Sequence, residues 1–197
     1  MKQLVLASNN PGKARELHRL LEPLGLEVLP QAAFDVPPID EPYPGFVENA
    51  LHKARHAARH SGLPALADDS GLCVAALGFE PGVHSARFAG EPKSDARNNA
   101  LLLERLAGVT DRSAYFYCVL VLVRSATDPR PLLADGEWHG EILQAPRGQA
   151  GFGYDPLFLV PNLGQTAAEL DEGLKNTLSH RGAAMRHMLE RLQVHPL

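Results

Sequence analysis

The chain has 197 residues, 45% of them hydrophobic, and its 19 Lys and Arg against 23 Asp and Glu give a net charge of −4. This length fits a single domain, or one domain in two lobes, and it supplies enough apolar side chains for a core. The balanced charge excludes a protein that binds nucleic acid or an anionic membrane through one general positive field.

We expect a cytoplasmic protein whose partners include neither nucleic acid nor a membrane. Cys73 and Cys118 lie in apolar runs, which indicates buried thiols of a reduced compartment and not a disulfide framework or a zinc site. The apolar run 4–7 is too short for a signal peptide, and no apolar run approaches the length of a membrane span.

The N-terminal segment predicts a strand, a polar turn and an amphipathic helix. Residues 3–7 form the apolar strand, and Asn10 and Pro11 suit the cap and the first position of the helix. The positive end of that helix, with Lys13 in its first turn, can bind an anion. The segment does not match a Walker A loop, which would need a Ser or Thr where Ala14 stands. The sequence therefore allows either a plain capped helix or a phosphate loop of another kind.

The next segments predict a second strand at 27–29 and a connection over 31–44 that contains four prolines. Such a long connection is usually functional or disordered, and its prolines favour an ordered loop. It carries Glu41, for which a solvated acid is the alternative. A helix over 46–60 follows, with a narrow stripe of small apolar residues. Lys53 lies beside that stripe, where it could reach a cleft or simply contact water.

Two adjacent carboxylates, Asp68 and Asp69, follow the apolar residues 65–67, where an interior strand comes to the surface. Because carboxylates are rarely buried without partners, the pair predicts a site for a hard cation, a proton or both. Successive strand residues point to opposite faces, so the two should have different roles unless the backbone bends. An ordinary turn at Ser70-Gly71 is the equally weighted alternative.

The second half predicts a helix over 94–106 capped by Ser94, a central strand over 113–124, and an antiparallel return over 132–143. A last strand over 157–160, a short helical piece over 167–170 and a final helix capped by Ser179 complete the pattern. The glycine-rich segment 144–156 ends in Phe152, Gly153, Tyr154 and Asp155. Its aromatic rings suit stacking on a planar base, or equally a place in the core.

In order and spacing, these motifs together resemble the inosine-triphosphate pyrophosphatase family over almost the whole chain. The motifs are Ser8–Lys13, Glu41 with 46–50, Lys53, Asp68–Gly71, Pro81-Gly82 with Ser85–Arg87, Gly151–Pro156 and Ser179–Gly182. The resemblance implies one domain over residues 1–197. It also implies an α/β fold with a long twisted mixed β-sheet flanked by helices, two lobes with a central cleft, and a homodimer.

The resemblance further implies a magnesium-dependent hydrolase that cleaves ITP, dITP and XTP to the nucleoside monophosphate and pyrophosphate. Asp69 matches the general base, and Glu41 and Asp69 match the Mg2+ ligands. Residues that match triphosphate or substrate contacts are Ser8, Asn9, Asn10, Pro11, Gly12, Lys13, Lys53 and Ser70. Residues that match the purine pocket are Phe152, Gly153, Tyr154, Asp155, Lys175, His180 and Arg181.

Two alternatives stay open from the sequence. One is a septum-protein-like pyrophosphatase for other modified nucleotides, against which the segments 151–156 and 179–182 argue. The other is a nucleotide-binding regulator without turnover, against which the retained Glu41 and Asp69 argue. Asp68 is expected to assist from behind the metal ligands.

Overall fold

The computed structural model describes residues 2–21 and 25–197, and its chain divides into two compact units. Unit 1 comprises Met1–Asp69, Cys118–Gly136 and His180–Leu197, and unit 2 comprises Ser70–Tyr117 and Glu137–Ser179. One seven-stranded sheet of order β2-β1-β3-β4-β5-β6-β7 is built from both units, because the division falls within β3, β4 and β5. The predicted central cleft stays a prediction.

The sheet is mixed, as predicted, because β1 pairs in parallel with β2 and β3 whereas β6 pairs antiparallel with β5 and β7. Its strands are β1 (Gln3–Ala7), β2 (Glu27–Pro30), β3 (Ala65–Val74), β4 (Ser113–Val123), β5 (Leu132–Ile142), β6 (Phe158–Val160) and β7 (Gln165–Thr166). The apolar strand predicted over 113–124 is β4, the middle strand of the order, and its residues 118–123 are buried on both faces.

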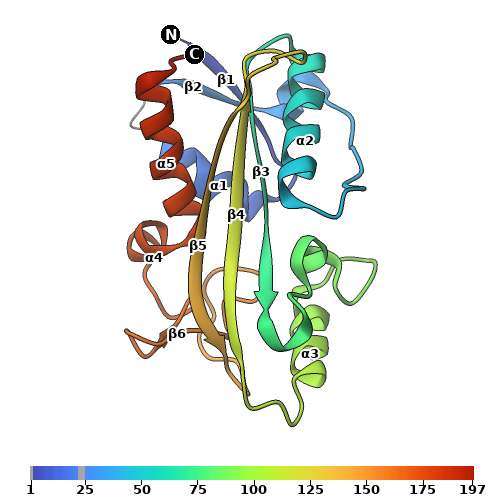
Figure 1. The fold of residues 1–197 in the computed structure, drawn as a ribbon, viewed down its shortest axis with the longest axis vertical. Helices are drawn as coiled ribbons and strands as arrows, with labels where there is room; N and C mark the ends of the chain where they lie inside the picture. Colours follow the sequence, from blue (N-terminus) through green and yellow to red (C-terminus); the bar gives the residue numbers. More distant parts are fainter. Residues whose placement is uncertain (1, 22–24) are drawn as a thin grey trace. The chain divides into compact units, whose positions relative to one another are not determined.

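Helices cover both faces of the sheet within unit 1 (Figure 1). On one face, α1 (Pro11–Leu21) and α5 (His180–Val194) share a core with β1, β3 and β4, to which Leu17, Leu120 and Met185 belong. On the other face lies α2 (Phe46–Ser61), whose buried side chains are Asn49 and four alanines. These small residues let the helix approach the sheet closely, which places Lys53 near the strand carboxylates.

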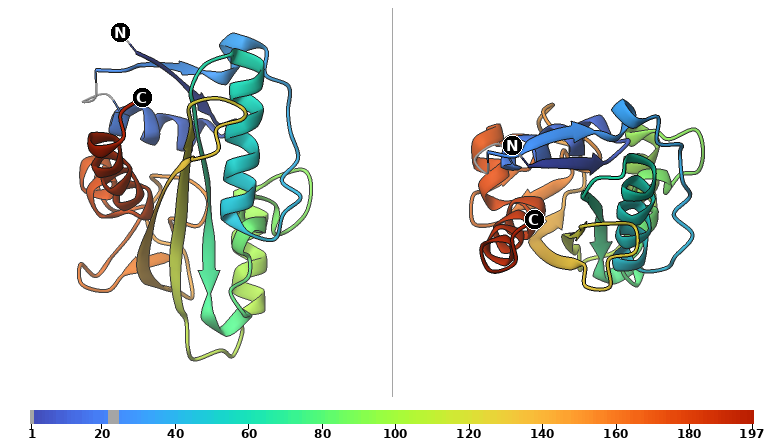
Figure 2. Two further views of the ribbon diagram at one scale, coloured as in Figure 1. Left: turned by 45° about the horizontal axis from the view of Figure 1, so that its top comes forward. Right: turned by 90° about the horizontal axis from the view of Figure 1, so that it is seen from above.

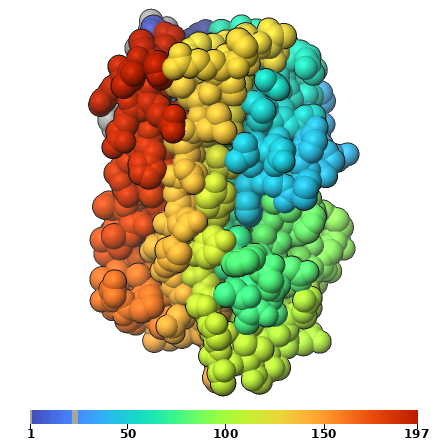
Figure 3. Space-filling model, in the orientation of Figure 1, coloured from blue at the N-terminus to red at the C-terminus, as the bar shows by residue number. Residues whose placement is uncertain are grey.

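The connection from β2 to α2 begins with a 3-10 turn, η2 (Gln31–Phe34), and runs over the surface beside α2 (Figure 3). A hydrogen bond of 2.9 Å between His56 Nε2 and the Pro37 carbonyl ties it to that helix. The two ends of the chain lie side by side in unit 1, where the Lys2 ammonium donates to the Leu197 carbonyl (Figure 2).

Unit 2 has its own, largely aromatic core. The ring centroid of Phe158 lies 4.6 Å from that of Phe116 and 5.1 Å from that of Trp138. Its helices and 3-10 turns are η3 (Ala75–Leu77), η4 (Gly82–Arg87), α3 (Asp95–Arg105) and α4 (Glu172–Leu178). Ser94 caps α3 as predicted, because its hydroxyl accepts the Arg97 N–H at 3.3 Å.

Two local predictions are wrong. The chain does not turn at Ser70-Gly71, because β3 continues through both residues. A Cβ on Gly71 would lie 2.1 Å from the Gly82 carbonyl oxygen, so glycine is needed there for a close approach of backbone. Residues 167–170 form turns and not a helix, since the Ala167 N–H donates to the Phe158 carbonyl at 2.9 Å. Among the described residues, no helix is long and apolar enough to cross a membrane.

Candidate functional site

The turn between β1 and α1 has the capped geometry that its sequence predicts. The Asn10 side-chain oxygen accepts the N–H groups of Gly12 at 2.9 Å and Lys13 at 3.2 Å, and Pro11 begins the helix. The Asn9 side-chain oxygen accepts from Gln31 Nε2 at 2.5 Å. Because Asn10 already occupies two N–H groups of the helix end, the Lys13 ammonium is the main charge available there for an anion.

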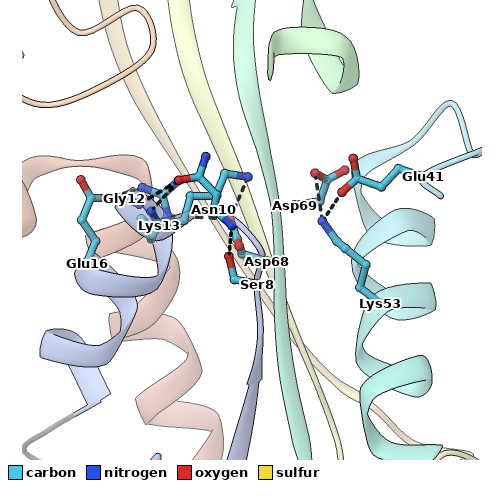
Figure 4. A network of polar contacts seen from close by, with 10 residues as sticks. Ser8, Asn10, Gly12, Lys13, Glu16, Glu41, Lys53, Asp68 and Asp69 are labelled. Atoms are coloured by element: carbon cyan, nitrogen blue, oxygen red, sulfur yellow. Dashed lines mark hydrogen bonds and ion pairs between the residues drawn. The ribbon is translucent and has the colours of Figure 1, made fainter. Parts of the chain in front are cut away.

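A buried cluster of alternating charges lies on one side of β3 (Figure 4). Asp68 Oδ2 lies 3.2 Å from Lys13 Nζ and 3.8 Å from Arg181 Nε. The Arg181 guanidinium also forms an ion pair with Glu16. Burial alone would raise the pKa of Asp68, but Lys13 and Arg181 more than offset it and hold that pKa well below its usual range. Asp68 is therefore an anion throughout the neutral range.

A second charged group lies on the other side of β3 (Figure 4). Lys53 Nζ, from α2, lies 2.5 Å from Glu41 Oε1 and 3.5 Å from Asp69 Oδ1. Burial works against the charged form of Lys53, but Asp69, Asp68 and Glu41 together raise its pKa. Burial also raises the pKa of Asp69, and Lys53 offsets only part of that effect. Asp69 is thus a stronger base than a solvated aspartate.

The two aspartates have different partners, as the alternation of a strand predicts. Glu41 and Asp69 converge on one ammonium, so their oxygens already meet at a position that holds positive charge. Among the described residues there is no group of three or more His, Cys, Asp or Glu that could hold a metal ion. Two carboxylates still fit Mg2+, which keeps most of its water and takes phosphate oxygens as further ligands.

The segment Gly151–Pro156, called here the 151–156 loop, lies in unit 2 and is held by side chains around it. Asp155 Oδ2 accepts from Lys175 Nζ at 2.6 Å and from the Phe152 N–H at 2.9 Å. Lys175 Nζ also lies 4.9 Å from the centroid of the Phe152 ring. The Tyr154 hydroxyl donates to the Ser85 carbonyl at 2.9 Å. Tyr154 is a core residue, whereas Phe152 is half-buried.

The structure divides the predicted site residues between the two units. Unit 1 holds Ser8–Lys13, Glu41, Lys53, Asp69, His180 and Arg181, and unit 2 holds Ser70, Phe152, Gly153, Tyr154, Asp155 and Lys175. Within unit 1, Arg181 contacts Glu16 and Asp68, on the same side of β3 as Lys13. These carboxylates explain how a cation is tolerated in the first turn of α5, where the helix dipole opposes it.

Sequence reasoning missed one acid of this cluster, Glu16. It follows Arg15 in a polar stretch of the sequence, yet it is only 7% exposed. Its position three residues after Lys13 puts both side chains on one face of α1, and that spacing is the signal that could have found it. Burial opposes the charged form of Arg181, but Glu16 and Asp68 together raise its pKa, so this pair stays ionised.

These features define an α/β protein with a charged site in unit 1 whose parts suit a polyanion and a metal cation. The sequence profile of the Ham1 family matches residues 4–191. The chain belongs to the Ham1 family. The resemblance inferred from the motifs is confirmed, and so is the α/β fold with a mixed sheet flanked by helices.

Relatives match over the full length of the chain. The "dITP/XTP pyrophosphatase" of Aromatoleum aromaticum (strain DSM 19018 / LMG 30748 / EbN1) is 76% identical over 195 residues, which cover 99% of this chain and 98% of the relative. A HAM1 protein from Coxiella burnetii has a TM-score of 0.92 at 50% identity, covering 98% of this chain and 100% of its own. The Staphylococcus aureus Ham1 protein gives 0.88 at 38% identity with the same coverages.

Proposed function

We propose that this chain is a nucleoside-triphosphate pyrophosphatase that hydrolyses ITP, dITP and XTP to the monophosphate and pyrophosphate. The observation that carries the proposal is the division of charge across β3. Lys13, Asp68 and Arg181 lie on one side, and Lys53, Asp69 and Glu41 lie on the other. A relative 76% identical over 99% of the chain is called a dITP/XTP pyrophosphatase, which supports the substrate class.

Glu41 and Asp69 would hold Mg2+ in this proposal, because their oxygens converge on one cationic position. When bound, the ion would neutralise phosphate charge and lower the pKa of the water molecules that it holds. Lys13 and Lys53 bind the polyphosphate through their ammonium groups. Asp69 orients the attacking water and accepts its proton, for which its raised pKa is favourable. Positioning and electrostatics carry most of the barrier reduction in such reactions.

Within unit 2, the residues proposed for purine selection are Phe152 and Lys175. Hypoxanthine and xanthine present a 6-oxo acceptor where adenine presents an amino donor. Donor side chains therefore pair with hypoxanthine or xanthine but find no acceptor on adenine. In a buried site such a missing hydrogen bond discriminates strongly against adenine. The half-buried Phe152 ring offers a stacking surface for any purine.

We further propose a cytoplasmic homodimer, on the strength of the family resemblance. Light scattering on the purified protein tests this. A mass of one chain at micromolar concentration would contradict it.

A substrate panel tests the function. ITP, dITP, XTP, GTP, ATP and dUTP are incubated with and without Mg2+, and nucleoside monophosphate and pyrophosphate are measured separately. We expect ITP, dITP and XTP to be hydrolysed fastest, with pyrophosphate formed in equal amount and activity lost on chelation. Faster hydrolysis of dUTP would favour the septum-protein-like alternative. Binding without turnover would favour the regulator.

A further inference from the structure

Two side chains of helix α3 form hydrogen bonds with both backbone polar groups of one glycine in the 151–156 loop, Gly153. The Gly153 N–H donates to Asp95 Oδ2 at 2.7 Å, and the Gly153 carbonyl accepts from Asn99 Nδ2 at 2.8 Å. Asp95 and Asn99 are four residues apart and so lie one above the other on the same face of α3. They are 58 and 54 residues distant from Gly153 in the sequence.

The chemistry of these contacts is specific to the residue types present. Asn99 Nδ2 also donates to the Asp95 carbonyl at 2.9 Å, so its two hydrogens serve two different acceptors. Asp95 offers only acceptors and meets a donor, and Asn99 turns its donors toward an acceptor. An aspartate at position 99 would have the shape of asparagine but no hydrogen to donate, and it would face the Gly153 carbonyl with negative charge.

Gly153 has a backbone conformation that favours glycine. Its φ of +62° lies in the left-handed region, and a Cβ there would meet no atom within 4 Å. The two hydrogen bonds from α3 hold its peptide groups, in addition to the turn hydrogen bond of 3.3 Å from the Asp155 N–H to the Phe152 carbonyl. Peptide planarity extends their effect to the Phe152 carbonyl and the Tyr154 N–H, because each belongs to a peptide plane that is held at Gly153.

The rest of the loop has separate anchors. Tyr154 is held by its contact with the Ser85 carbonyl, and Phe152 by the Asp155 carboxylate and the Lys175 ammonium. Loss of the α3 contacts would thus leave the loop in place, with its tip held only by the turn hydrogen bond from the Asp155 N–H to the Phe152 carbonyl. Discrimination between purines needs contacting groups held to within about 0.5 Å, whereas simple binding does not.

We propose that Asp95 and Asn99 are positioning residues that set the purine selectivity of the 151–156 loop, an inference that rests on the proposed function. They act through Gly153 and touch no substrate themselves. The class of ligand they select is the nucleobase, with a 6-oxo purine favoured over a 6-amino purine. The charged site in unit 1 does not depend on them.

The test compares Asn99→Asp with Asn162→Asp, which makes the same chemical change at an exposed position of unit 2. Kinetics on ITP and ATP are measured for both full-length variants with Mg2+. For Asn99→Asp, we expect the ITP to ATP ratio of kcat/KM to fall about tenfold and KM for ITP to rise, with kcat changed by less than about twofold. Inhibition by inorganic tripolyphosphate, which has no base, should be unchanged. Asn162→Asp should match the unsubstituted protein throughout.

A second pair of variants protects the test against misfolding. Asp95→Asn keeps an acceptor for the Gly153 N–H and should lose less selectivity than Asp95→Ala. Hydrogen exchange should rise at 151–156 in Asn99→Asp and Asp95→Ala while the rest of unit 2 stays protected. An unchanged ITP to ATP ratio in both variants overturns the inference, and so does an equal loss of kcat on both nucleotides. Failure of the unsubstituted protein to prefer ITP would instead reject the proposed function.

Discussion

The charged cluster of unit 1 and the tip of the 151–156 loop in unit 2 are held by different kinds of interaction. In unit 1 the contacts are between full charges, and Asp68, Arg181 and Glu16 are each less than a tenth exposed. In unit 2 the tip of the 151–156 loop is held by hydrogen bonds of side chains to one glycine backbone. Removing one partner of a buried ion pair lowers the folding stability strongly, whereas removing a single hydrogen bond lowers it by about 1 kcal/mol.

This difference predicts where variants will act. Changes among the charges of unit 1 should alter turnover or the stability of the whole unit, because each charge supports the next. Changes in the contacts to the tip of the 151–156 loop should alter which nucleotide is accepted, because they shift the geometry of the tip and leave the charges of unit 1 unchanged.

Asp69→Asn should reduce kcat on ITP by about a thousandfold, because it removes the proton acceptor and one proposed ligand of Mg2+. Binding of ITP should persist, since Lys13 and Lys53 keep their charge. Steady-state rates and calorimetric binding of ITP measure the two quantities. Turnover within about tenfold of the unsubstituted protein would remove Asp69 from both of its proposed roles.

Arg181→Met should lower the free energy of unfolding by about 3 kcal/mol, because it removes the buried ion pair of Glu16 with the guanidinium and deprives Asp68 of one cationic partner. Urea denaturation of the variant measures the loss. The double variant Arg181→Met with Glu16→Gln also removes the buried negative charge of Glu16 and should recover part of the stability. A loss below about 1 kcal/mol in the single variant would mean that the buried charges of unit 1 do not support one another.

The sequence could predict the parts of this arrangement that local patterns encode. The apolar run of β4, the Asn10 cap of α1 and the alternation of Asp68 and Asp69 follow from periodicity and capping rules, and the structure has each of them. Glu16 and Gly71 were misjudged for a different reason. Their contacts are tertiary. Glu16 forms a buried ion pair with Arg181, 165 residues away, and Gly71 is approached by the backbone of Gly82, and neither periodicity nor capping rules encode such contacts.

The α3 contacts to Gly153 belong to the same class of hidden features. Asp95 and Asn99 have ordinary residue types for the first half of a helix, where an acid favours the positive dipole end. No pattern in the neighbouring residues predicts that their side chains form hydrogen bonds with a glycine more than fifty positions later. The sequence could not decide whether the rings of Phe152 and Tyr154 lie in the core or are available for stacking. In the structure Tyr154 is a core residue, whereas Phe152 is half-buried.

Phe152→Leu sharpens the contrast within unit 2. Stacking acts on every purine, so KM for ITP and for ATP should rise together, each about tenfold. The ITP to ATP ratio should stay near that of the unsubstituted protein, unlike the ratio in Asn99→Asp. Steady-state kinetics on both nucleotides separates the two effects. A large fall in the ratio with little change in KM for ATP would show that the ring itself selects the base.

Asp128→Asn should have the smallest effect, about 1 kcal/mol of stability at pH 7. This carboxylate lies in unit 1 and accepts the backbone N–H groups of Arg124 at 2.9 Å and Arg130 at 2.8 Å. Like the contacts of Gly153, these are hydrogen bonds between a side chain and the backbone. Burial would raise its pKa, but these N–H groups and the Arg124 guanidinium together lower it.

The sign of the pH dependence follows from that lowered pKa. A carboxylate with a pKa lower in the folded than in the unfolded chain adds stability above its unfolded pKa of about 4 and loses it as the pH falls further. The difference in unfolding free energy between the unsubstituted protein and Asp128→Asn should therefore shrink from pH 7 to pH 3. Asp40→Asn, at an exposed position of the same unit, is the matched control and should show no such difference. A gap that widened on acidification would mean that Asp128 is held mainly in its protonated form, contrary to its contacts with donors.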